Sequence, residues 1–174
     1  MTSTIEPCRL PDGALLNRYS ENGGFADCYV TALASPVTQE QYVEAFYSSA
    51  LFCIERRLIG WFAGRPATDA DARALARGEQ ERFSAWRVEA RAPDQLLLRD
   101  YTSRTRSWLM SAHVEGGTRL YFGSAVVPRA DATTGERRLG FVFHALLGFH
   151  RVYSRVLLGA ARAKLARHGD PEIP

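Results

Sequence analysis

The stretch from Leu139 to His168 constrains the fold most, because it can form one amphipathic helix of about 30 residues. At roughly 100° per residue, its apolar and small residues recur on one broad face. The members of that predicted face are Phe141, Ala145, Phe149, Val152, Val156, Gly159, Ala160 and Ala163. A helix this long needs an apolar partner surface, and a β-sheet is the natural one.

A second stripe of the same helix is basic, with Arg151, Arg155 and Arg162 within roughly 40° of one another. Residues 137–168 hold six Arg and one Lys with no Asp or Glu, so the rest of a chain of net charge +3 carries −4. Such a stripe is either a solvated face whose last-turn cations suit the helix dipole, or a contact with a membrane surface or an acidic partner. The predicted strands fit no base-stacking motif, so we expect no nucleic acid partner.

Length and composition indicate one globular domain, since 174 residues with 46% hydrophobic and 24% charged side chains can bury a sizeable core. We expect a lead-in over residues 1–24, a single domain over 25–168 and a tail over 169–174. The start of the chain lacks a secretory pattern. Nothing reaches the roughly 18 apolar residues needed to span a bilayer. These patterns predict a cytoplasmic protein with reduced thiols.

The order of patterns along the chain predicts an α+β fold. Alternating residues mark strands over 25–33, 81–92, 95–101, 104–115 and 119–128. Helices are expected from Thr38, where Gln41 completes a capping box, over 51–62, and from Thr68. Four consecutive strands with short turns, one of them Glu115-Gly116-Gly117-Thr118, form an antiparallel meander.

This order resembles the helix-grip fold of the START/SRPBCC superfamily, to which the birch pollen allergen belongs. The matching segments are FADCYVTAL (25–33), the helices between Thr38 and Phe62, the meander from Glu81 to Pro128 and the closing stretch Leu139 to His168. The segment DQLLLRDYTSRTRSWLMSAHV also resembles an uncharacterised bacterial subgroup, a domain of unknown function. The sequence predicts fewer strands than the superfamily sheet has, so either one more lies in the lead-in or the sheet is reduced.

The resemblance implies a sheet wrapped around the C-terminal helix, with two short helices after the first strand and a hydrophobic cavity between sheet and long helix. Members of the superfamily bind lipids, sterols, polyketides or other apolar ligands, and some are cyclases or hydroxylase components. No catalytic residue is common to the superfamily, so none is carried over to this chain.

Several residues are candidates for lining such a cavity. Arg106 and Trp108 share a strand face, and an inward Arg106 could pair with a ligand carboxylate or phosphate; it could equally lie at the rim, satisfied by Asp100 or Glu115. Aromatic side chains that converge if the helix packs on the sheet either fill an ordinary core or enclose a ligand. The predicted ligand-binding set is Cys28, Trp86, Arg106, Trp108, Phe122, Phe141 and Phe149.

Metal and cofactor chemistry find no support in the residue pattern. His113, His144, His150 and His168 lack ligand spacing, and Cys8, Cys28 and Cys53 are too widely spaced for a zinc or disulfide framework. We therefore predict no metal and no cofactor.

Three functions stay open, and the sequence favours the first because no residue set states a reaction. The first is binding of a small hydrophobic ligand, either neutral or anionic. The second is an enzyme of cyclase or hydrolase type on the same scaffold. The third is an interaction protein using the basic part of the closing helix. The sequence predicts no oligomeric state.

Overall fold

The computed structural model describes residues 4–21, 25–53, 67–127, 129–130, 137–138 and 141–169. The predicted α+β class is confirmed, with an antiparallel sheet and a long C-terminal helix. The elements are β1 (Glu6–Pro7), α1 (Asn17–Glu21), β2 (Phe25–Leu33), α2 (Gln39–Tyr47), α4 (Asp69–Ala76), β3 (Arg82–Phe83), β4 (Trp86–Ala92), β5 (Gln95–Asp100), β6 (Thr105–Val114), β7 (Gly117–Val126), β8 (Arg129–Ala130), β9 (Arg137–Arg138) and α5 (Phe141–Gly169).

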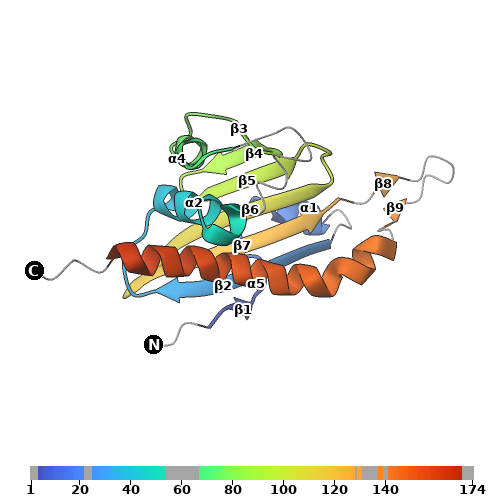
Figure 1. Ribbon diagram of the computed structural model, residues 1–174. Coiled ribbons are helices and arrows are strands. Elements are labelled where there is room, and N and C mark those ends of the chain that lie inside the picture. Colours follow the sequence, from blue (N-terminus) through green and yellow to red (C-terminus); the bar gives the residue numbers. More distant parts are fainter. Residues whose placement is uncertain are drawn as a thin grey trace, which may run out of the picture.

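One seven-stranded sheet organises the molecule, in the order β1-β2-β7-β6-β5-β4-β3 (Figure 1). The meander was predicted with four strands, and the one expected over 81–92 is divided into β3 and β4. Strand β2 joins the meander beside its last strand. The lead-in supplies β1, which pairs with β2 through Glu6 and Val30. The lead-in therefore belongs to the sheet, and the strand missing from the sequence prediction lies there.

Local signals position the helices and turns as expected. Thr38 and Gln41 form a complete capping box at the start of α2, and Thr68 and Asp71 form another at the start of α4. The β6–β7 hairpin turns at Glu115 and Gly116, where Gly116 has a φ of 81° that favours glycine. The strand ends differ by a few residues from the prediction, since β7 starts at Gly117.

Helices α2, α4 and α5 cover one side of the sheet, which we call the helix face (Figure 1). The helix face holds the larger of two apolar cores, in which aromatic rings of α2 meet leucines of the strands. Fully buried members include Tyr42, Phe46, Tyr47, Leu96, Leu98, Leu109, Leu120 and Leu158.

The face that α5 buries differs from the predicted one. Val152 and Val156 were expected to be buried, but they are 62% and 50% exposed, while Leu157, Leu158 and Ala161 are buried instead. This helix is apolar almost all round over that stretch, so periodicity alone offers two faces. The two leucines bury more apolar area than the valines and small residues, and they take the side toward α2 and β2.

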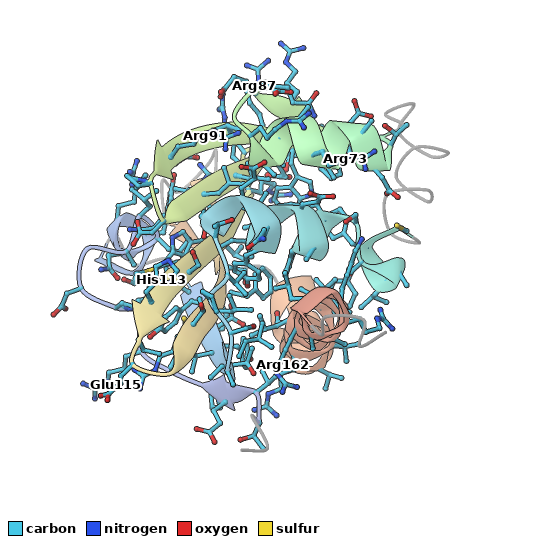
Figure 2. The ribbon with its side chains drawn as sticks, turned by 90° about the vertical axis from the view of Figure 1, so that its left-hand side faces the viewer. Arg73, Arg87, Arg91, His113, Glu115 and Arg162 are labelled. Carbon is cyan, nitrogen blue, oxygen red and sulfur yellow. The ribbon has the colours of Figure 1, made fainter. Side chains whose placement is uncertain are left out.

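The opposite side of the sheet carries a second core beneath the N-terminal segment 8–20, and we call it the N-terminal face. Figure 2 shows the sheet between the helices on one side and this segment on the other. Ala14 and Leu16 of the segment pack against Cys28, Leu97 and Trp108. Trp108 was expected to lie on the side of the closing helix. This prediction is wrong, because Trp108 lies on the N-terminal face.

Gln95 fastens the N-terminal segment to the sheet. Its side-chain oxygen accepts hydrogen bonds from the backbone N–H of Leu15 and from the indole N–H of Trp108, both at 2.9 Å, and its amide donates to the carbonyl of Gly13 at 3.2 Å. Because Gln95 is only 8% exposed, each partner satisfies a polar atom that would otherwise be buried alone.

Gly123 lets the central strand accept this packing. A Cβ atom at Gly123 would lie 2.9 Å from the carbonyl oxygen of Asp27, the Leu16 side chain and the Trp108 ring. A side chain at this position would displace the backbone of β2 as well as both side chains above it.

We expect Gly123→Ala to lower the free energy of unfolding by about 1–3 kcal/mol through overpacking. Gly159→Ala in α5 is the contrasting control, because its Cβ would meet only the end of the Ile5 side chain at 3.2 Å. Alanine in a helix is favoured over glycine, so this variant should match or exceed the wild type. Denaturant unfolding measures both, and equal losses would contradict this account of Gly123.

Candidate functional site

A row of polar side chains crosses the helix face of the sheet, next to the aromatic rings of α2. Asp27 of β2 lies opposite Ser124 of β7, and Ser124 lies opposite Ser107 of β6. The Asp27 carboxylate accepts hydrogen bonds from the Ser124 hydroxyl at 2.7 Å and from its backbone N–H at 3.2 Å. The Tyr47 hydroxyl of α2 lies 3.1 Å from the Ser107 hydroxyl. We call Asp27, Ser124, Ser107 and Tyr47 the polar row.

Aromatic and apolar side chains surround the polar row. Phe122 is 4% exposed, and its ring centre lies 4.9 Å from that of Phe46. Trp86 packs partly buried against the same core at the far end of the row, and its buried indole N–H has no hydrogen-bond partner among the described residues. Helix α5 runs along the sheet over β2 and β7 (Figure 1), the strands of Asp27 and Ser124, whereas Ser107 of β6 is covered by Tyr47 of α2.

The polar row places hydrogen-bond donors and acceptors next to one another. A carboxylate accepts up to about four hydrogen bonds, and hydroxyl groups both donate and accept. Arg106 is not part of this face. Among histidines with described side chains, His113 is exposed on β6 (Figure 2). Within the described part of the chain, no three His, Cys, Asp or Glu side chains gather into a metal site.

The N-terminal face holds an ion-pair network. The Arg106 guanidinium lies 2.7 Å from the Glu89 carboxylate, and the Tyr19 hydroxyl donates to the same carboxylate. The Arg106 guanidinium carbon also lies 4.6 Å from the centre of the Tyr19 ring. Burial, followed by the hydrogen bond to Glu89, raises the pKa of Tyr19. Arg106 is 8% exposed, pairs with Glu89 and donates to the Ser103 carbonyl at 2.8 Å, so it is poorly placed to take an external anion.

A β-bulge in β4 changes the face of Ala90 and leaves Glu89 on the same side as Arg106. The β4–β5 register shifts between Val88 and Ala90, so Glu89 is the extra residue. Strict alternation would place Val88 and Ala90 on one face, but with the bulge Val88 lies on the helix face and Ala90 on the N-terminal face. Glu89 alternates with Trp86 and Val88 of the helix face, and it takes the place of both predicted partners of Arg106, Asp100 and Glu115.

The predicted ligand-binding set is divided between the two faces. Trp86 and Phe122 lie on the helix face, whereas Cys28, Arg106 and Trp108 lie on the N-terminal face. The side chains of Phe141 and Phe149 lie outside the described residues. The structure thus brings Trp86 and Phe122 to the side of the closing helix and separates them from the other three.

The sequence analysis missed all members of the polar row. The signal available was parity: Asp27 alternates with Cys28, and Ser107 alternates with Trp108. Once one strand is oriented, register fixes the others. Which strand residues point to the helices depends on what covers each face of the sheet. The sequence of segment 8–20 does not reveal that this segment packs on the sheet.

No family model matches the chain, and no characterised protein matches it in sequence. Within the described residues, no helix is both long and apolar enough to cross a membrane.

We expect Glu89→Gln to destabilise the protein by about 3 kcal/mol, because it leaves the buried Arg106 charge without its partner. Replacing both residues, as Glu89→Leu with Arg106→Met, should restore most of that loss, since no uncompensated charge remains. Thermal unfolding of Glu89→Leu, Arg106→Met and the double variant completes a mutant cycle. Additive losses would show that the pair is not coupled.

Proposed function

We propose that this protein binds a small, largely apolar ligand between the helix face of the sheet and α5, in the manner of helix-grip proteins. The observation that carries the proposal is the polar row, a set of buried hydrogen-bonding groups that lie side by side on a face rich in leucines and aromatic rings. Apolar surroundings with a few convergent polar groups are typical of small-molecule sites.

The sheet order supports the helix-grip interpretation. The strand before the helices lies beside the last strand of the meander, and the long helix follows that last strand across the same face. This connectivity agrees with the superfamily pattern that the sequence resembles.

The chemistry of the row favours a ligand with a hydrogen-bond donor over an anionic one. The expectation of an anion depended on Arg106, which faces the other way and is paired with Glu89. Asp27 supplies a carboxylate at the row, and a carboxylate repels an anion while accepting from a hydroxyl or an amide N–H. The preferred ligand is therefore a neutral ring or chain carrying at least one donor group.

The basic stripe of α5 gives the interaction hypothesis less support. The Arg155 guanidinium lies over the Tyr29 ring at 5.5 Å, and the Arg162 side chain, labelled in Figure 2, donates to the Ala32 carbonyl at 3.2 Å. Lys164 donates to the Ser48 hydroxyl at 2.8 Å. These cations bind the protein's own strands and helices.

Naphthol and naphthalene test the proposal as a matched pair of fluorescent probes, because they differ by one hydroxyl donor. We expect saturable binding of both, with naphthol tighter. Asp27→Asn should weaken naphthol binding about 10-fold or more, since a hydrogen bond to a charged group contributes about 1.5–3 kcal/mol. Naphthalene binding should change little.

Ser111→Ala is the control variant, because Ser111 is buried on the same face but lies four residues from Ser107 along β6, roughly 13 Å away. It should leave both affinities unchanged. Absence of saturable binding to the wild type, or equal effects of the two variants, would contradict the proposal.

A further inference from the structure

Two cysteines from distant positions meet at the N-terminal face. The sulfur atoms of Cys8 and Cys28 lie 3.1 Å apart, and the Cys8 backbone N–H donates to the Cys28 carbonyl at 2.9 Å. This bond continues the β1–β2 register, in which Glu6 lies opposite Val30. A hydrogen-bonded antiparallel pair has Cα atoms about 5.5 Å apart, within the range that a disulfide spans.

We propose that Cys8 and Cys28 form a reversible intramolecular disulfide by exchange with small-molecule disulfides. The sulfur atoms need to approach by only about 1 Å to reach bonding distance. The proposal is independent of the ligand site on the helix face, because both cysteines lie on the other side of the sheet.

The two thiols differ in solvent exposure, and this difference indicates which cysteine reacts first with the small disulfide. Cys8 is half-buried, whereas Cys28 is 4% exposed. The hydrogen bond between the two thiols lowers the pKa of Cys8, while the same bond, followed by burial, raises the pKa of Cys28. The more accessible sulfur is thus also the better source of thiolate, which is the nucleophile in exchange.

The reaction balances without any other reagent. The Cys8 thiolate attacks one sulfur of the small disulfide, and the first small thiolate leaves. The Cys28 sulfur then gives up its proton and attacks the Cys8 sulfur, so that the second small thiolate leaves. The two protons of the cysteines end on the two small thiols, and the small disulfide is reduced by two electrons.

The link would fasten the segment that covers the N-terminal face. Residues 9–20 lie inside the closed loop and include Leu16, which packs over Gly123, and Tyr19, which binds Glu89. A disulfide that closes a loop of this length raises Tm by roughly 6–12 °C in a protein of this size, because it restricts the unfolded chain. The disulfide would therefore link the N-terminal segment covalently to the sheet. After its reduction the segment would be held by Gln95 and apolar contacts.

Titration of the reduced full-length protein with oxidised glutathione tests this assignment. Intact mass should show loss of two hydrogens, peptide mapping should locate the link between Cys8 and Cys28, and Tm should rise by the amount stated above. Amide hydrogen exchange in residues 9–20 should slow on oxidation.

Three variants separate the roles of the cysteines. Cys28→Ser should stop at a glutathione adduct on Cys8, Cys8→Ser should leave Cys28 unmodified while the protein is folded, and Cys53→Ser should form the link as the wild type does. A link that involves Cys53, an adduct on Cys8 that never resolves in the wild type, or formation only in denaturant would overturn the proposal.

A second, independent feature is a row of arginines across the sheet. Arg82, Arg87, Arg99 and Arg106 are direct register partners on four adjacent strands. Arg106 is neutralised by Glu89. The other three have no carboxylate partner among the described residues, and like charges placed opposite one another are destabilising.

These three arginines line a pocket of about 280 Å³ at one end of the sheet, with Arg87 pointing away from the body of the protein (Figure 2). Asp100 also lines it, but its carboxylate accepts from the backbone N–H groups of Arg104 and Thr105 at 2.7 and 2.9 Å. Ser84 and Ser103 line the same pocket with φ values of 52° and 58°, which cost energy in non-glycine residues.

The geometry points to a binding site for a phosphate monoester dianion in this pocket. Three guanidinium groups around one Asp leave a net positive charge of two, which a dianion neutralises, and arginine forks match phosphate oxygens. The dianion would also relieve the repulsion between Arg82, Arg87 and Arg99.

Calorimetric titration at low ionic strength with inorganic phosphate, and sedimentation with phosphatidic acid vesicles, form the two arms of the test. Binding in the first arm alone indicates a soluble phosphate, and binding in the second alone a lipid headgroup; either supports the site. Arg87→Gln or Arg99→Gln should weaken binding about 10-fold or more.

Arg73→Gln is the control, because Arg73 is an exposed arginine of α4 outside the pocket (Figure 2). It should leave binding unchanged. Binding in neither arm, or equal loss in the Arg73 and Arg87 variants, would overturn the assignment.

Discussion

The pleat of the central strands assigns each side chain to one of two cores, and the rest of the structure depends on both cores being closed. On β7, Phe122 and Ser124 face the helices, while Gly123 between them faces the N-terminal segment. The row Leu97, Trp108, Gly123, Cys28 crosses four strands in register on that second face. Only glycine leaves space there for the Trp108 ring and Leu16 together, so one residue without a side chain lets two layers share a single sheet.

This two-sided burial decides which chemistry each face can offer. The cation that a ligand anion would need is on the N-terminal face, bound to Glu89 and stacked on Tyr19. The carboxylate that a neutral donor would need is on the helix face, bonded to Ser124. Because a charge buried with its partner is costly to separate, neither group can serve the opposite face. The sheet thus separates the Asp27 carboxylate of the polar row from a structural ion pair.

Much of the element order could be read from the sequence, because local signals set it. Capping boxes at Thr38 and Thr68 and the glycine turn at Gly116 depend on neighbours within four residues. Strand parity could not be read in the same way. Trp108 is large and apolar on either face, and only the N-terminal segment, which looked like a loose lead-in, determines its side.

The remaining errors have the same origin in long-range packing. The bulge at Glu89 inverts the alternation of β4 without a Gly or Pro to announce it. Helix α5 offered two apolar faces, and the choice between Val156 and Leu157 was made by α2 and β2. The Cys8–Cys28 contact spans 20 positions and exists only because β1 pairs with β2. The spacing of residues along the sequence does not predict such long-range contacts.

Both edges of the sheet end in strands of two residues, β1 and β3. An exposed edge strand presents unpaired backbone groups to other chains, and short edges limit that pairing. At the β1 edge, Pro7 lacks an N–H group and lies at the position opposite Tyr29, between the hydrogen-bonded positions of Glu6 and Cys8. Without residues 8–20, the apolar row that includes Leu97 and Trp108 would face water. The N-terminal segment therefore closes one face of the sheet and ends one of its edges, which makes it as much a part of the domain as the closing helix.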